Sequence, residues 1–192
     1  PPAPPRFFFL AVVGLRALVR CRGLGDVYKR QTHGNATAAA EYNIYADPEA
    51  ASIVFASGIP IRMVGLNVTS TFGVTQTELD RLHAASGIGR ELAGALQFYL
   101  DRQTSTYEHS YAPMHDTCAV IPYINPLWIE YKPLHVVVEC VGTHTRGMTL
   151  CDTRGSVIGG ENENSQTANA QVAIMADADA IIAQAIADLS HH

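Results

Sequence analysis

The chain has 192 residues, of which 47% are hydrophobic and 16% are charged, and its formal net charge is −5 at pH 7. This apolar content can fill one substantial core, so the composition excludes a generally disordered chain. The negative charge would repel polyanions, which argues against nucleic acid or an anionic membrane as a partner. A neutral small molecule would not be repelled, and the length fits one globular domain.

The first 31 residues differ in character from the rest. An apolar run at residues 7–15, FFFLAVVGL, is too short to span a bilayer as a helix. Arginines follow it instead of a small-residue cleavage site, and residues 23–31 resemble translated adaptor sequence. We expect residues 1–31 to be a non-native leader; a targeting segment and a genuine domain element are the alternatives. Native sequence would then begin at Thr32.

The four cysteines form no CxxC motif and no cluster with zinc-ligand spacing. They are Cys21, Cys118, Cys140 and Cys151. We expect buried free thiols in a reducing, cytoplasmic compartment, because free cysteine is commonly buried. A disulfide scaffold is the weaker alternative in a chain this long and poor in cysteine.

In chain order, the first helix signal is Asp47-Pro48-Glu49, which combines a capping side chain, a proline suited to the first helical position and a dipole-compatible acid. This helix is expected to end at Gly58. The apolar, β-branched stretch 61–69 predicts a buried strand. Residues 75–78, TQTE, form a capping-box pattern that opens a helix through Gly87.

A second helix is predicted over residues 90–103, a polar and aromatic loop over 104–116, and a buried helix over 117–126. Apolar runs predict strands at 135–142 and 170–176. Asp177 is expected to cap a last helix. Helices thus alternate with apolar strands, which predicts an α/β fold with a largely parallel (mixed), Rossmann-like sheet flanked by helices.

Asn35, Glu41 and Asn43 are the first candidate binding residues, placed just ahead of a helix start. Asparagine offers donors and an acceptor, whereas ionised glutamate only accepts. Such a set suits a sugar, whose hydroxyls both donate and accept. An ordinary loop with capping side chains is the alternative.

His115-Asp116 is the second candidate. Histidine can transfer a proton near neutral pH, and aspartate is an oxygen ligand for Ca²⁺ or Mg²⁺. A capping role for Asp116 at the start of the next helix is one alternative, and a metal-dependent phosphohydrolase using the pair is another. Tyr107 and His109 lie in the preceding aromatic loop and could contact a planar base. Arg146 is expected to brace its loop rather than bind an anion.

Three stretches together resemble the inosine-uridine preferring nucleoside hydrolases: residues 34–69, 112–120 and 146–155. The resemblance extends from residue 34 to about residue 186. It implies hydrolysis of the N-glycosidic bond of ribonucleosides to ribose and free base, as in purine or pyrimidine salvage. It also implies a Ca²⁺ cofactor, a nucleoside substrate, and a homo-oligomer (dimer or tetramer) at full length.

Carried over by position, the resemblance assigns Asn35, Glu41 and Asn43 to the ribose hydroxyls. Asp116 would bind Ca²⁺ and touch the sugar, and His115 would protonate the departing base. The family's amino-terminal aspartate cluster, which supplies most Ca²⁺ ligands, has no counterpart here. Residues 32–192 are therefore expected to be the carboxyl-terminal part of an incomplete nucleoside hydrolase fold, inactive alone. A catalytically dead ribose- or nucleoside-binding fragment is the alternative.

Overall fold

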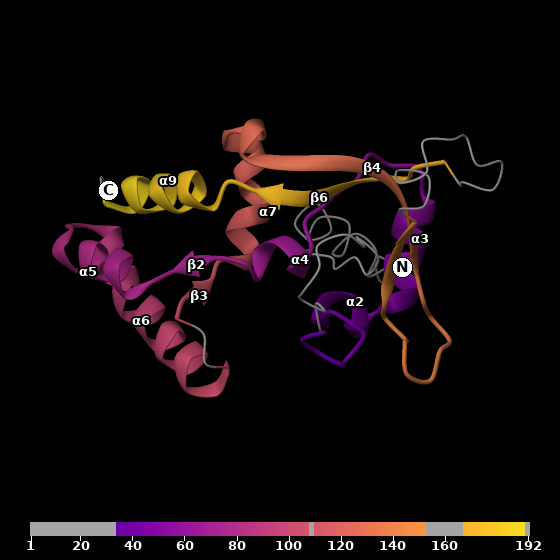
Figure 1. The fold of residues 1–192 in the computed structure, drawn as a ribbon, viewed down its shortest axis with the longest axis horizontal. Helices are drawn as coiled ribbons and strands as arrows, with labels where there is room; N and C mark the ends of the chain where they lie inside the picture. The colour runs from indigo at the N-terminus through magenta and orange to yellow at the C-terminus, as the bar shows by residue number, and fades with distance from the viewer. Residues whose placement is uncertain (1–33, 108–109, 153–166, 191–192) are drawn as a thin grey trace, which may run out of the picture. The chain divides into compact units, whose positions relative to one another are not determined.

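The computed structural model describes residues 34–107, 110–152 and 167–190. These residues separate into two compact units (Figure 1). The first unit comprises the described residues up to Asn67 together with those from Glu130 to Met175. The second comprises Val68–Ile129 and the described residues from Ala176 onward. Each unit has a hydrophobic core of its own, and each is described separately below.

The first unit is a four-stranded sheet with two helices. Its strands are β1 (Arg62–Met63), β4 (Ile129–Val138), β5 (Thr149–Asp152) and β6 (Ala170–Ala176), in the order β1-β6-β4-β5. β1 pairs with β6 in parallel, whereas β4 and β5 form an antiparallel pair. The sheet is therefore mixed, as the sequence predicts.

Two short helices, α2 (Tyr42–Ala46) and α3 (Pro48–Ala56), contribute apolar side chains to the core of this unit. The core consists of Ile44, Ala51, Phe55, Met63, Leu134, Val136, Cys151, Ala170 and Val172. The predicted start of α3 is confirmed, since the Asp47 carboxylate accepts a hydrogen bond from the backbone N–H of Ala50 at 3.0 Å. This local cap fixes where α2 ends and α3 begins.

Asn169 joins three elements of the first unit just ahead of β6. Its side-chain oxygen accepts the backbone N–H of Val136 at 2.8 Å. Its amide nitrogen donates to the carbonyls of Val136 at 2.9 Å and of Phe55 at 3.0 Å. One side chain thus satisfies both backbone groups of a residue in β4 and a carbonyl near the end of α3, which would otherwise lack partners.

The second unit is mainly helical. It contains the strands β2 (Gly73–Val74) and β3 (Ala112–Pro113), the helices α5 (Gln76–Ala84), α6 (Ile88–Tyr107), α7 (His115–Ile124) and α9 (Ala178–Ser190), and the 3₁₀ helix η1 (Pro126–Trp128). Helices α5, α6 and α9 pack on one another around Val74, Leu79, Leu82, Ala93, Leu100, Ala112 and Ile186. A Cβ on Gly89 would lie 2.2 Å from the carbonyl oxygen of Leu189, so only glycine permits this approach of α6 to α9.

Two of the predicted helix starts in this unit are confirmed. Thr75 and Glu78 form the predicted capping box at the start of α5. The Asp177 carboxylate accepts the backbone N–H of Ala180 at 3.0 Å, which caps α9. In the part of the chain that the structure describes, no helix is both long and apolar enough to cross a membrane.

Three predicted element boundaries are wrong. The strand expected over residues 61–69 is confined to β1, and Leu66–Thr69 form the short helix α4, because a short buried apolar run does not distinguish strand from helix. The loop expected over residues 104–116 is helical at both ends, since α6 continues to Tyr107 and α7 begins at His115. After Gly94 no glycine or proline occurs before the end of α6 at Tyr107, so nothing local ends the helix at the predicted residue 103.

The strand expected over residues 135–142 instead begins at Ile129 and ends at Val138. Pro133 is tolerated within it because β5 pairs with β4 only over His135–Val138, so the missing N–H removes no bond to β5. Cys118 and Cys140 are free, as predicted, but Cys151 is disulfide-bonded. Burial of Cys151 therefore did not indicate its oxidation state.

We predict that Asn169→Ala lowers the free energy of unfolding by about 3 kcal/mol, because it leaves backbone groups of Val136 and Phe55 without partners. The measurement is urea denaturation of the purified chain followed by circular dichroism. Gln171→Ala, an exposed amide truncation on the adjoining strand, serves as the control. A loss no larger than that of the control would contradict the bracing role of Asn169.

Candidate functional site

The predicted sugar-binding residues lie in one tightly bonded segment of the first unit, residues 34–46, called the sugar segment below. The Asn35 side-chain oxygen accepts the backbone N–H of Tyr42 at 2.8 Å. The Glu41 carboxylate accepts the N–H groups of Asn43 at 2.9 Å and Ile44 at 3.2 Å, and so caps α2. The capping alternative is thus correct for Asn35 and Glu41.

The capping bonds do not exhaust the polar groups of the sugar segment. The side chain of Asn43 is exposed on the first turn of α2, and Asn35 is exposed as well. Glu41 is only 4% exposed. Its carboxylate is held in place by the backbone N–H groups of Asn43 and Ile44. The segment therefore exposes two side-chain amides close in sequence to a buried carboxylate, and groups of these kinds can bind hydroxyls.

A loop between β4 and β5 packs against the sugar segment. Gly147 in this loop has a φ of +82°, and a Cβ there would lie 3.0 Å from the Tyr45 Cα and 3.1 Å from the Ala40 Cβ. Both the backbone conformation and the close approach require glycine. Residues before and after Glu41 are thus held by the same point of the loop.

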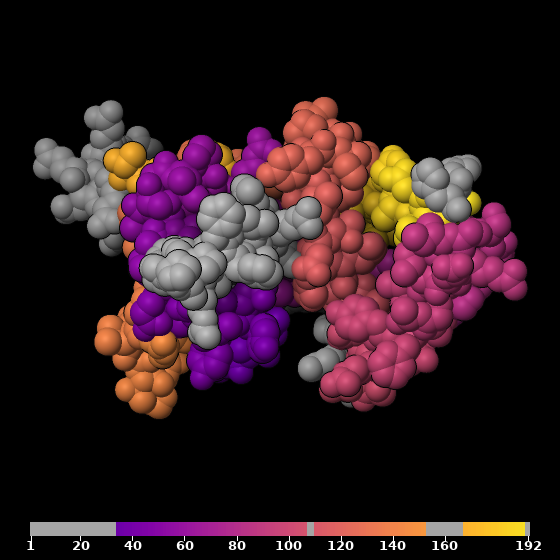
Figure 2. Space-filling model, turned by 180° about the vertical axis from the view of Figure 1, so that it is seen from behind, coloured from indigo at the N-terminus to yellow at the C-terminus, as the bar shows by residue number. Residues whose placement is uncertain are grey.

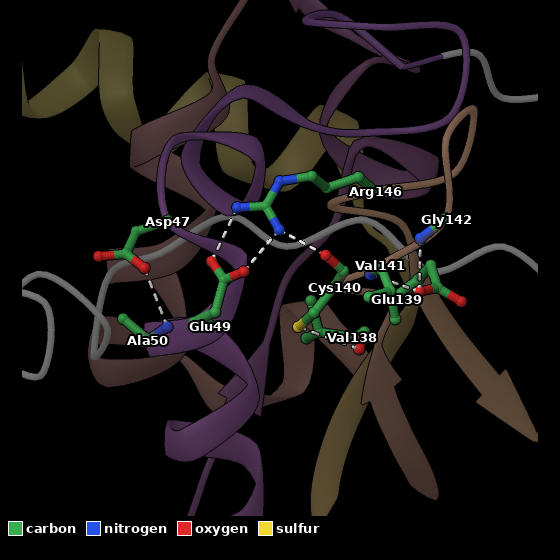
Figure 3. Close-up of polar contacts among 9 residues, drawn as sticks. All are labelled: Asp47, Glu49, Ala50, Val138, Glu139, Cys140, Val141, Gly142 and Arg146. Carbon is green, nitrogen blue, oxygen red and sulfur yellow. Dashed lines mark hydrogen bonds and ion pairs between the residues drawn. The ribbon is translucent and has the colours of Figure 1, made fainter.

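Arg146 braces this loop, as the sequence predicts. Its guanidinium forms two bonds to the Glu49 carboxylate, Nη1–Oε1 at 2.5 Å and Nη2–Oε2 at 2.9 Å (Figure 3). A further bond runs from Nη1 to the carbonyl of Cys140. The Arg146 hydrogen bond lowers the pKa of Glu49, and the same bond raises the pKa of Arg146.

The predicted acid residues lie at the start of α7 in the second unit. His115 Nδ1 is 2.8 Å from the hydroxyl oxygen of Thr69, which is fully buried at the end of α4. Asp116 is exposed within the first turn of α7, and Met114 occupies the N-cap position, so the predicted capping role of Asp116 is wrong. A carboxylate in a first turn still interacts favourably with the helix dipole.

The surroundings of His115 favour its neutral form. Burial lowers the pKa of His115, and the neighbouring Asp116 carboxylate opposes this shift. A buried imidazole loses hydration when it is charged, whereas an adjacent negative charge stabilises the imidazolium. Asp116 thus offsets part of the effect of burial on the pKa of His115.

Thr69 is the residue of this group that sequence reasoning missed. It fell within the predicted strand 61–69, where its hydroxyl had no assigned role. The available signal was a hydroxyl embedded in the apolar run LNVT, a place where a polar group needs a partner. Its partner, His115, is distant in sequence, so only the fold identifies the pair.

The remaining candidates are less defined. Tyr107 is the last residue of α6 rather than part of a loop, and His109 lies outside the described residues. Asn35, Glu41 and Asn43 belong to one unit and His115 and Asp116 to the other, so each group is described by itself. Stacking of Tyr107 and His109 on a base stays a prediction.

The described residues do not fit a calcium ion by themselves. Across residues 34–107, 110–152 and 167–190 there is no group of three or more His, Cys, Asp or Glu side chains able to hold a metal. Ca²⁺ takes about six to eight oxygen ligands. Asp116, the predicted metal ligand, would need acidic partners beyond this part of the chain.

The mixed sheet of the first unit and the helices of the second define the class of an α/β protein. The chain belongs to the inosine-uridine preferring nucleoside hydrolase family, whose sequence profile matches residues 21–183. This match confirms the family resemblance and covers most of the chain.

Individual relatives agree with this assignment. The pyrimidine-specific ribonucleoside hydrolase RihB of Escherichia coli O157:H7 (strain EC4115 / EHEC) is 37% identical over 147 residues, which cover 76% of this chain and 45% of the relative. Among solved structures, the purine-preferring ribonucleoside hydrolase from Gardnerella vaginalis is 30% identical with a TM-score of 0.70, covering 83% of this chain and 48% of that one.

The plant nucleoside hydrolase PpNRh1 is 28% identical, with a TM-score of 0.75 and coverage of 84% of this chain and 51% of its own. The chain thus spans about half the length of these relatives. The α/β fold predicted from the sequence is the fold of nucleoside hydrolases.

We predict that Thr69→Val lowers the free energy of unfolding by about 1 kcal/mol, because the partly buried Nδ1 of His115 loses its hydrogen-bond partner while side-chain shape is kept. Thr69→Ser retains the hydroxyl and is expected to lose less. Urea denaturation of the three proteins provides the comparison. An equal loss in the valine and serine variants would show that packing, and not the hydrogen bond, matters at this position.

Proposed function

We propose that the protein represented by this chain hydrolyses the N-glycosidic bond of ribonucleosides to ribose and a free base. The observation that carries the proposal is the sugar segment, in which exposed Asn35 and Asn43 flank the buried carboxylate of Glu41 in a nucleoside hydrolase family member. Activity of the whole protein is a proposal, since the chain spans about half of its relatives.

The sugar segment would act by binding and orienting ribose. Asparagine amides donate to and accept from hydroxyls, and the Glu41 carboxylate accepts from them. Cleavage of a glycosidic bond passes through an oxocarbenium-like state, in which positive charge develops on the sugar. A carboxylate held in place by the N–H groups of Asn43 and Ile44 would stabilise that charge without having to reorganise.

His115 would donate a proton to the departing base, which makes the base a better leaving group. Thr69 would set the orientation of the ring through Nδ1 and leave Nε2 available for the transfer. Asp116, which raises the pKa of His115 against the effect of burial, would increase the protonated fraction. Calcium, implied by the family resemblance, does not fit the described residues alone, and no step is assigned to it.

For the chain by itself a second candidate is nucleoside binding without hydrolysis. This candidate is favoured by the lack of an acidic cluster among the described residues. Cytoplasmic nucleoside salvage and assembly into a dimer or tetramer at full length follow from the family resemblance and are part of the proposal. Relatives described as pyrimidine-specific and as purine-preferring both match, so no base preference is proposed.

Nucleoside binding is tested by titrating uridine and inosine into the chain and following backbone amide signals by NMR. We expect shifts at Asn35, Glu41 and Asn43 with the nucleosides and much smaller ones with the free bases uracil and hypoxanthine. Asn43→Ala is expected to weaken nucleoside binding roughly tenfold at unchanged unfolding free energy, because the exposed side chain caps no helix. Equal responses to nucleosides and free bases would exclude ribose recognition.

Hydrolysis is tested by measuring base release from the chain alone and from the chain joined to the amino-terminal half of a family member. We expect release only from the joined protein. His115→Gln in that protein is expected to lower kcat by roughly 10²–10⁴-fold, the range typical of a lost general acid. His83→Gln, in helix α5 of the same unit, is the matched control. Undiminished release in the His115 variant would remove His115 from the mechanism.

A further inference from the structure

The loop of residues 139–148, between β4 and β5, is bonded internally. The backbone N–H of Gly147 donates to the Glu139 carbonyl at 2.7 Å, and that of Arg146 to the Gly142 carbonyl at 2.9 Å. The Glu139 carboxylate accepts the N–H groups of Val141 at 2.8 Å and Gly142 at 3.0 Å, and these bonds lower the pKa of Glu139. The loop therefore has a defined shape before it contacts anything else.

This loop reaches helix α3 through Arg146. The bidentate pair with Glu49 joins residues 97 positions apart in sequence, and the bond to the Cys140 carbonyl ties the same guanidinium back to its own loop (Figure 3). The two side chains are 42% and 54% exposed, so the pair adds little to global stability. The two parallel bonds of the guanidinium nevertheless fix the orientation of Arg146 relative to Glu49, which a single bond would not do.

The contacts of the loop lie on both sides of the sugar-binding residues. Gly147 approaches Ala40, which precedes Glu41, and Tyr45, which follows Asn43 by two positions, so closely that a Cβ there would lie 3.1 Å and 3.0 Å from their atoms. Glu49 lies in the first turn of α3, directly after α2. The stretch that carries Glu41 and Asn43 is thus held at its beginning, at its end and at the following helix by one loop.

We propose that Arg146 and Glu49 are positioning residues that hold residues 40–45 in the conformation that binds ribose. This inference rests on the proposed function for its ligand. Both terminal nitrogens of the Arg146 guanidinium, Nη1 and Nη2, bond to the Glu49 carboxylate. In this proposal Arg146 therefore acts through the sugar segment and does not bind an anion. The pair affects the binding step through the placement of Glu41 and Asn43.

The first test is amide hydrogen exchange of the whole chain, read at Tyr42, Asn43, Ile44 and Tyr45, whose N–H groups are all bonded within the segment. We expect Arg146→Lys, which keeps the charge but loses the fork, to raise exchange there by roughly three- to tenfold through local opening. Glu49→Gln should give the same rise. Arg90→Lys, at an exposed arginine of α6, is the matched control.

A double variant makes the test specific to the pair. If the two residues act through each other, Glu49→Gln combined with Arg146→Lys should raise exchange no further than either change alone. The dissociation constant for uridine should rise about threefold or more in each variant while the urea midpoint stays near that of the unaltered chain. Affinity lost at unchanged stability is an outcome that a merely structural pair would not produce.

Exchange at residues 42–45 that matches the Arg90→Lys control would overturn the proposal, as would a rise spread evenly over the first unit. Additive effects in the double variant would also overturn it. If the unaltered chain shows no ribose-dependent binding, ribose recognition by the sugar segment of this chain fails, and the exchange data still decide whether the pair holds the segment. If the unaltered chain binds and its affinity survives both substitutions, the positioning role fails and the proposed function stands.

Discussion

The first unit depends on the way Asn169 completes the backbone hydrogen bonding around Val136. A strand that twists out of register or ends early leaves N–H and C=O groups in the interior, and each costs free energy if it has no partner. Asn169 supplies partners for two such groups in β4 and a third near the end of α3. The same residue therefore links the sheet to α3, the helix that follows the sugar segment.

The polar side chains of the sugar segment serve the backbone first. Asn35 and Glu41 occupy N–H groups at the start of α2, and Thr37 accepts those of Ala39 and Ala40. Such bonds convert a short, otherwise marginal helix into a fixed platform. In the proposed ribose-binding role, the Glu41 carboxylate would need no rearrangement when a sugar arrives, because the backbone has already oriented it. Structural and binding roles are thus compatible in one residue.

In the second unit, His115 is likewise held in place by a hydrogen bond, and a neighbouring charge acts on it. His115 stands at the start of α7, and the buried hydroxyl of Thr69 holds one ring nitrogen while Asp116 acts on the charge of the ring. Burial and the adjacent carboxylate push the pKa of His115 in opposite directions. The pKa of His115 therefore depends on its burial and on the neighbouring Asp116 carboxylate. The start of α7 differs from an ordinary capped helix in where Thr69, His115 and Asp116 lie, more than in their residue types.

The sequence by itself determined the features that act over a few residues. The caps at Asp47, at Thr75 with Glu78, and at Asp177 bond to N–H groups three residues away or closer, so pattern alone locates these helix starts. The apolar run 170–176 is likewise a strand with the predicted bounds. The family resemblance assigned roles to Asn35, Glu41, Asn43, His115 and Asp116, whereas spacing alone favoured an ordinary capping loop for the first three.

Tertiary structure alone decided what depends on partners far along the chain. Thr69 meets His115 across 46 positions and Arg146 meets Glu49 across 97, and no local pattern encodes either pair. The apolar stretch 61–69 is part strand and part helix because burial, which both elements satisfy, does not select between them. Pro133 lies inside β4 but outside the stretch that pairs with β5, a limit that only the sheet register shows. Hydrogen bonds between residues close in sequence can be predicted from the local pattern. The partners of a buried polar group are determined only when distant parts of the chain pack together.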